Sequence, residues 1–135
     1  MKKNYILLFT LLAMMLSMVG CTAQSTENSE TQTYQTITGA QAKEMIDADD
    51  TVIILDVRSQ EEYDTGHIEG ALLIPDTQIT EDAEALLADK DATILVYCRS
   101  GRRSALAAAD LAELGYTGIY DFGGIIDWEY EVVVE

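Results

Sequence analysis

One stretch of this chain, residues 93–115, constrains the fold more than any other, because a strand, a tight loop and a helix follow one another there without a break. Residues 93–97 read Thr-Ile-Leu-Val-Tyr, an apolar and β-branched run that predicts a buried strand. Cys98 comes next, and after the loop an Ala- and Leu-rich stretch with helical spacing runs on to Gly115. A strand that leads directly into a helix favours an α/β architecture.

The same alternation continues along the rest of the chain. Further strands are predicted at residues 52–57, 71–74 and 118–122, the first of them apolar enough for the centre of a parallel sheet. Helices are predicted after capping boxes that begin at Thr38 and Ser59, over the helical spacing of Ile79, Ala83, Leu86 and Leu87, and, as a short turn, near Trp128. The chain is therefore predicted to be an α/β protein with a mainly parallel central sheet and helices on both faces.

The junction between strand and helix gives Cys98 a reactive setting. Backbone N–H groups converge at a helix N-terminus and the helix dipole is positive there, which lowers the pKa of a thiol. The loop continues as Arg99, Ser100, Gly101, Arg102 and Arg103. Three arginines beside one thiol, in a chain of net charge −16, create a local site that attracts anions. We expect Cys98 to be a nucleophile and the loop to bind an anionic substrate.

The N-terminal residues have the pattern of a leader rather than of a folded domain. Lys2 and Lys3 precede an apolar run that is short for a membrane span and ends in Gly20 before Cys21, as in a signal peptide. Residues 1–20 resemble a bacterial lipoprotein signal, which implies a lipid on Cys21; an ordinary secretory signal or an uncleaved anchor is the alternative. We expect a flexible polar tether over residues 21–34, a domain over residues 35–135, and a location on the extracytoplasmic face of the cell membrane.

Cysteine and histidine usage excludes several kinds of chemistry. If Cys21 carries lipid, Cys98 is the single free thiol, and no CxxC motif is present, so thioredoxin-type redox chemistry is disfavoured. His67 is the sole histidine, and no Cys/His cluster can hold a zinc ion. We expect no metal, no cofactor and no nucleic-acid partner for this acidic chain.

The motifs taken together match a known family. Leu55-Asp56-Val57-Arg58, Gly66-His67-Ile68-Glu69-Gly70-Ala71, and residues 96–104, Val-Tyr-Cys-Arg-Ser-Gly-Arg-Arg-Ser, follow one another in order, and Gly123-Gly124 with Trp128 comes last. This series resembles a single-domain rhodanese, a sulfurtransferase. The resemblance implies that Cys98 takes a sulfur from thiosulfate or a related small anion, becomes a persulfide, and passes the sulfur to cyanide or a thiol; a protein acceptor is left open.

The resemblance also implies supporting roles at the strand ends. Asp56 and Arg58 belong beside the catalytic loop, and we expect Arg58 to form a structural ion pair with a nearby carboxylate, with Glu62 as the candidate. His67 is expected to serve packing and hydrogen bonding rather than catalysis. Arg99 and Arg103 are expected to matter most for holding the donor.

Two other readings of the loop stay open. Phosphatases and arsenate reductases use a Cys-x5-Arg loop, whereas here only four residues separate Cys98 from Arg103. The shorter loop favours a smaller binding site, suited to a single sulfur atom rather than to a phosphate. Alternatively, the domain is a non-catalytic interaction module or a persulfide carrier for one partner. The retained cysteine and its arginines argue against a purely binding role, but they do not separate a carrier from an enzyme.

Overall fold

The protein is described by a computed structural model over residues 33–134. Its strands are β1 (Gln35–Thr36), β2 (Ile53–Asp56), β3 (Leu72–Leu73), β4 (Thr93–Cys98) and β5 (Gly118–Gly124). The α-helices are α2 (Gly39–Ala48), α3 (Gln60–Asp64), α4 (Ile79–Leu86) and α5 (Arg102–Glu113), with 3₁₀ turns η1 (Asp76–Gln78) and η2 (Ile125–Asp127). The predicted leader and lipid site, and the predicted tether apart from residues 33 and 34, fall on residues 1–32, outside the described residues, and stay predictions. Within the described range, no helix is both long and apolar enough to cross a membrane.

The strands form one parallel sheet in the order β1-β5-β4-β2-β3. Every strand predicted from the sequence is present, and the predicted α/β class is confirmed. The two-residue strand β1 was not predicted, because Gln35 and Thr36 carry no apolar pattern. Its position is set by pairing with Tyr120 and Asp121 of β5.

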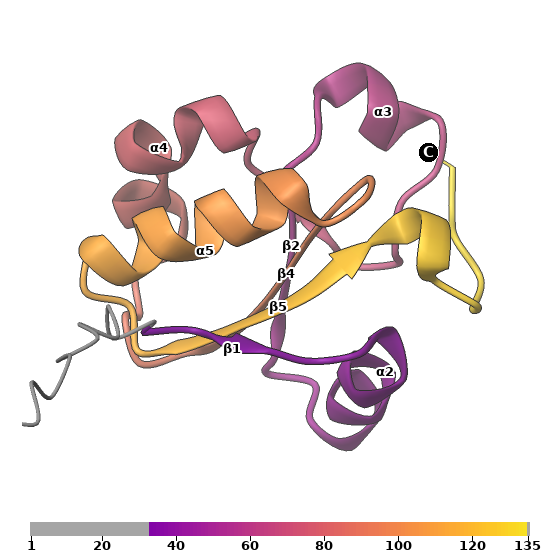
Figure 1. The fold of residues 1–135 in the computed structure, drawn as a ribbon, viewed down its shortest axis with the longest axis horizontal. Helices are drawn as coiled ribbons and strands as arrows, with labels where there is room; N and C mark the ends of the chain where they lie inside the picture. The colour runs from indigo at the N-terminus through magenta and orange to yellow at the C-terminus, as the bar shows by residue number, and fades with distance from the viewer. Residues whose placement is uncertain (1–32, 135) are drawn as a thin grey trace, which may run out of the picture.

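Helices cover both faces of the sheet, as Figure 1 shows, with α4 and α5 on one side and α2 on the other. Each face has its own hydrophobic cluster. The alternation of side chains along β4 explains the division: Ile94 and Val96 join the α4–α5 cluster, whereas Leu95 and Tyr97 join the α2 cluster. The same alternation directs Cys98 to the α4–α5 face, at the end of the strand.

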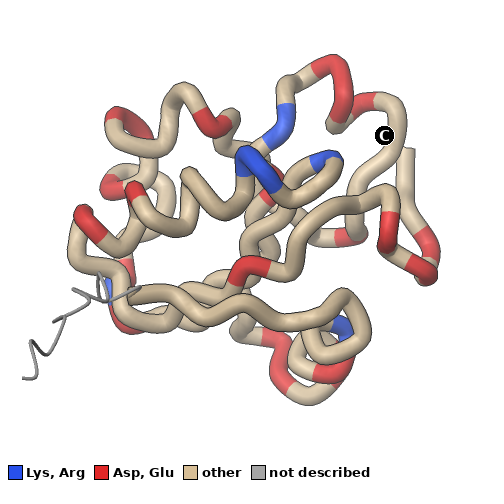
Figure 2. The backbone as a smooth tube through the Cα atoms, in the orientation of Figure 1, with Lys and Arg blue, Asp and Glu red and all other residues tan. Residues whose placement is uncertain are grey.

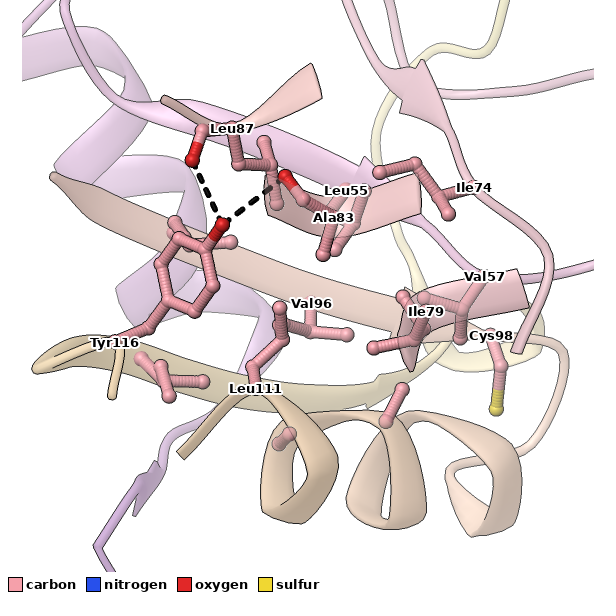
Figure 3. Close-up of a cluster of buried hydrophobic side chains, with 14 residues drawn as sticks. Leu55, Val57, Ile74, Ile79, Ala83, Leu87, Val96, Cys98, Leu111 and Tyr116 are labelled. Carbon is pink, nitrogen blue, oxygen red and sulfur yellow. Dashed lines mark hydrogen bonds between the residues drawn. The ribbon is translucent and has the colours of Figure 1, made fainter. Parts of the chain in front are cut away.

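The α4–α5 cluster packs strands β2 and β4 against α5, the helix that follows the Cys98 loop. Leu111 of α5 and Ile79 of α4 lie in this cluster with Val96 (Figure 3). At its far end, the buried Tyr116 hydroxyl lies 2.7 Å from the Leu87 carbonyl oxygen and 3.0 Å from that of Ala83. Tyr116 therefore ties the end of α5 to the end of α4, and the cluster holds α5 fixed against β4.

Both predicted capping boxes are present. Thr38 caps α2 through Gln41, and Ser59 caps α3 through Glu62, with the side chain of the N3 residue accepting a hydrogen bond from the cap amide in each case. Local hydrogen bonding thus sets where these two helices begin.

Candidate active site

Cys98 ends β4 at the carboxyl edge of the sheet, and its side chain is 1 % exposed. The chain then turns sharply through Ser100 and Gly101 into α5. Gly101 makes this turn with φ +99°, a left-handed conformation that disfavours residues with a side chain. This geometry lets the loop fold back over the sulfur.

The backbone of the loop faces the sulfur. The Gly101 amide donates a hydrogen bond to Cys98 Sγ at 3.0 Å, and the Ser104 hydroxyl lies 3.6 Å from it. Burial works to raise the pKa of the Cys98 thiol, but hydrogen bonds from the Ser104 amide and hydroxyl and from the Gly101 and Ser100 amides outweigh it. The pKa is held below its ordinary value, as predicted for this junction, and the thiolate is favoured.

Ser104 connects the sulfur to two neighbouring carbonyl groups. Its buried hydroxyl lies 3.0 Å from the Gly101 carbonyl oxygen and 3.3 Å from that of Gly123. The hydroxyl therefore links α5, the loop and the end of β5 at one point beneath Cys98. The sequence motif contained Ser104, but its residue type alone did not indicate this contact.

Two glycines at the end of β5 form the support under the loop. A Cβ atom at Gly124 would lie 2.3 Å from the Arg99 carbonyl oxygen and 2.6 Å from Ser100 Cα, far inside van der Waals contact. Gly123 turns with φ +89°, and β4 and β5 shift register between Val96 and Cys98. The predicted Gly123-Gly124 motif thus allows the loop to lie directly against the sheet.

The loop arginines differ in their surroundings. Arg99 and Arg102 are exposed, whereas Arg103 is partly buried. Arg103 forms a two-point ion pair with Glu62 of α3, with Nη–Oε distances of 2.7 and 2.8 Å. In Figure 2 the basic segments at the start of α5 and in the loop before it lie together, with acidic α3 close by.

The Arg103–Glu62 ion pair shifts the pKa of both side chains. The hydrogen bond from Arg103 is the main cause that lowers the pKa of Glu62 to about 2, and the same bond raises the pKa of Arg103. Glu62 also accepts a hydrogen bond from the Ser59 amide. The ion pair therefore connects the start of α3 to the start of α5 across the active site.

Asp56 and Arg58 form a buried ion pair at the end of β2, with a closest N–O distance of 2.7 Å. Arg58 also donates to the Gly66 carbonyl oxygen at 2.8 Å. The prediction of a structural ion pair for Arg58 is confirmed, but the candidate partner Glu62 was wrong. Asp56 lies two residues from Arg58, and its carboxylate also accepts a hydrogen bond from the Arg58 backbone amide. Glu62 instead pairs with Arg103.

The Asp56–Arg58 pair belongs to the α2 face of the sheet, next to Tyr97. The Arg58 guanidinium lies 5.6 Å from the centre of the Tyr97 ring, and the Tyr97 hydroxyl accepts a hydrogen bond from the Ile68 amide at 3.2 Å. Burial is the main cause that raises the pKa of Tyr97, and the hydrogen bond with Asp56 is the second. Asp56 and Arg58 thus brace the strand ends on the face opposite Cys98.

His67 and Trp128 also occupy structural positions. His67 is buried, stacks on Tyr63 with a centroid distance of 3.6 Å, and its Nδ1 lies 3.0 Å from the Tyr63 carbonyl oxygen. Its backbone pairs with Val133. Trp128 packs on Phe122 with a centroid distance of 5.6 Å, on the α2 face. The contacts of His67 agree with the packing and hydrogen-bonding role expected for it.

No group of three or more His, Cys, Asp and Glu side chains that could hold a metal ion occurs among residues 33–134.

The sequence pointed to three further residues of the site without indicating their contacts: Glu62, Ser104 and Gly124. Glu62 was recognised in a capping box but not as the partner of Arg103, because the two residues lie 41 positions apart in the sequence. A paired glycine directly after a predicted strand was the available signal for Gly124.

Comparison with known proteins decides the family. The sequence profile of the rhodanese-like domain matches residues 38–131, which include the Cys98 loop and its β5 support. The chain belongs to the rhodanese-like domain family.

Individual relatives agree with this assignment. The thiosulfate sulfurtransferase PspE of Escherichia coli (strain K12) is 40 % identical over 73 residues, which are 54 % of this chain and 70 % of that protein. A solved structure described as rhodanese with anions from E. coli superposes with a TM-score of 0.59 at 36 % identity, covering 62 % of this chain and 99 % of that one. YrkF of Bacillus subtilis (strain 168), named for a sulfur carrier role, is 36 % identical over 87 residues, 64 % of this chain and 46 % of that protein.

Proposed function

We propose that this rhodanese-family protein is a sulfurtransferase that moves a sulfane sulfur from thiosulfate, or a related donor, to a thiol or cyanide through a persulfide on Cys98. The observation that carries the proposal is the buried Cys98 sulfur with the Gly101 amide 3.0 Å from it. Donors aimed at a sulfur stabilise negative charge on it without any proton transfer. The naming of PspE as a thiosulfate sulfurtransferase supports the choice of donor.

In the first step the Cys98 thiolate attacks the outer sulfur of thiosulfate. A bond forms between Sγ and that sulfur, the S–S bond of thiosulfate breaks, and sulfite leaves with the bonding electron pair. No general base is needed, because hydrogen bonds already hold the pKa of Cys98 below its ordinary value. The exposed arginines Arg99 and Arg102 are placed to attract the anionic donor.

In the second step the acceptor removes the outer sulfur. Cyanide attacks it, the Sγ–S bond breaks, and thiocyanate leaves while Cys98 returns to the thiolate. Between the steps the persulfide carries its charge on the outer sulfur, and amides of a loop at a helix N-terminus stabilise such a charge. The loop thus supports both forms of the enzyme.

The geometry disfavours the phosphatase reading. Arg103 of the shorter loop is engaged by Glu62 in a two-point contact, whereas a phosphatase loop needs an arginine directed at a tetrahedral anion. A dedicated sulfur carrier remains the second candidate, supported by the similarity to YrkF. A carrier would use the same Cys98 persulfide but would accept sulfur from, or deliver it to, one protein partner.

Steady-state turnover with thiosulfate and cyanide tests the proposal. We expect thiocyanate to form with the wild-type protein and to be abolished by Cys98→Ser, since the hydroxyl of serine is not ionised at neutral pH. Circular dichroism should show that the variant keeps the fold. Wild-type turnover by a folded Cys98→Ser protein would refute the proposal, and a folded wild-type protein without turnover would favour the carrier.

We also propose that Cys21 carries a lipid and tethers the domain to the extracytoplasmic face of the cell membrane. The support is the sequence pattern of residues 1–21. Labelling of the expressed protein with palmitate should be lost in Cys21→Ser, and the protein should move from the membrane to the soluble fraction or keep its uncleaved leader. Labelling of the variant equal to wild type would refute the assignment.

A further inference from the structure

A carboxylate lies at the active site beside the basic loop. Glu62 of α3 binds both terminal nitrogens of Arg103 and is fixed by the Ser59 amide at 3.1 Å. Arg103 stands in the first turn of α5, directly before Ser104, whose amide and hydroxyl face the sulfur. Three hydrogen bonds thus fix the Glu62 carboxylate against the first turn of α5, beside the loop.

Arg103 is opposed by several negative charges. Its guanidinium interacts electrostatically with Glu62, with the Cys98 sulfur and with Asp76. One positive charge cannot balance all three anions, so an incoming anionic donor does not meet a free arginine at this position. Arg99 and Arg102 are exposed, and water and salt screen their attraction.

We infer that Glu62 determines donor specificity by charge, so that a monoanionic sulfur donor is preferred over the dianion thiosulfate. This inference rests on the proposed function. Methanethiosulfonate represents the preferred class, since a methyl group replaces one charged oxygen of thiosulfate. The Cys98 thiolate attacks its outer sulfur, the S–S bond breaks, and methanesulfinate leaves with the electron pair. The chemistry and size match those of thiosulfate, while the charge differs by one.

The test compares kcat/KM for the two donors, with cyanide as acceptor, in wild type and Glu62→Gln. Glutamine keeps the capping box with Ser59, because the N3 position accepts Glu or Gln equally. The variant should lower the preference for methanethiosulfonate over thiosulfate severalfold, because it removes one unit of negative charge that opposes the second charge of thiosulfate. The change should arise mainly from a lower KM for thiosulfate.

Matched variants separate the charge of Glu62 from its structural role. Glu61 is exposed in the same turn of α3, so Glu61→Gln removes the same formal charge and should change the preference by less than half as much. Glu62→Asp keeps the charge and should retain the wild-type preference. If Glu62→Gln slows both donors equally, Glu62 acts only on structure and the inference is overturned.

A second variant carries the test if Glu62→Gln fails to fold. Arg103→Gln leaves the Glu62 charge without its neutralising partner, so the preference for the monoanion should rise severalfold; an unchanged preference overturns the inference. Failure of the proposed function is a separate result, because a wild-type protein that takes sulfur from neither donor would show it before any variant is compared.

Discussion

Replacement of Gly124 by alanine should disable the active-site loop from below. The added Cβ would lie 2.3 Å from the Arg99 carbonyl oxygen and 2.6 Å from Ser100 Cα. Gly124 has φ −118°, so alanine causes no backbone strain and its effect comes from the lack of space alone. To reach ordinary contact, the loop beside Cys98 must move by about 1 Å, and misplacement on that scale costs roughly 100-fold in rate.

The same clash should also destabilise the fold. Overpacking costs about 1–3 kcal/mol, which corresponds to a fall in melting temperature of about 4–8 °C per kcal/mol for a domain of this size. Activity must therefore be measured well below the melting temperature of the variant. Two assays suffice: thiocyanate formation from thiosulfate, and the rate at which iodoacetamide alkylates Cys98.

Two other glycines supply the controls. A Cβ at Gly118 would lie 2.5 Å from the Ala92 carbonyl oxygen, at the end of the sheet far from Cys98, so Gly118→Ala should lose stability but keep its rate per folded molecule. A Cβ at Gly39 would lie 3.6 Å from the Trp128 ring, so Gly39→Ala should change neither. Wild-type alkylation of Gly124→Ala, or an equal loss of rate in Gly118→Ala, would refute the idea that Gly124 sets the loop position.

Three further predictions concern polar contacts of the side chains of Ser104, Glu62 and Tyr116. The rate of Cys98 alkylation should follow a titration whose midpoint lies below the ordinary thiol value of about 8.5. Ser104→Ala should raise that midpoint, because the thiolate loses the hydrogen bond of the hydroxyl. A wild-type midpoint at the ordinary value would contradict the account. Because the pKa of Glu62 is lowered to about 2 by Arg103, their ion pair should stabilise the fold above about pH 4.5, and this contribution, about 1 kcal/mol after allowance for solvent screening, should fade as the pH falls toward 2. Urea titrations across that pH range should show a free energy of unfolding that depends less on pH in Glu62→Gln than in wild type. An equal pH dependence in both proteins would show that the ion pair does not cause it. Tyr116→Phe should cost about 1–2 kcal/mol, since buried carbonyl groups lose the hydroxyl, with no change in rate per folded molecule.

The parts of the fold that depend on local sequence were predictable. Capping boxes at Thr38 and Ser59 fixed two helix starts, and the apolar run before Cys98 fixed the central strand, because hydrogen bonds and side-chain alternation within a few residues decide these features. The strand β1 was not predictable in this way. It exists because the chain pairs with β5, a contact between residues far apart in the sequence.

In the candidate active site, too, the features set by local sequence were predictable and those set by distant contacts were not. The low pKa of Cys98 followed from its place between a strand and a helix, which the sequence displays. The partners of the arginines did not follow, because they depend on how α3 is positioned over α5. Arg58 pairs with Asp56 rather than with Glu62, since two residues on one strand end meet more closely than a strand end and a helix. The support from Gly124 depends on the register shift between β4 and β5, which no local pattern encodes.

The most direct measurement of the central claim is the intact mass of the protein after brief exposure to thiosulfate. The account predicts a gain of one sulfur atom, located on Cys98 by peptide mapping, absent from Cys98→Ser, and reversed by cyanide with release of thiocyanate. A folded wild-type protein with a titratable Cys98 thiol that gains no sulfur from thiosulfate would contradict it.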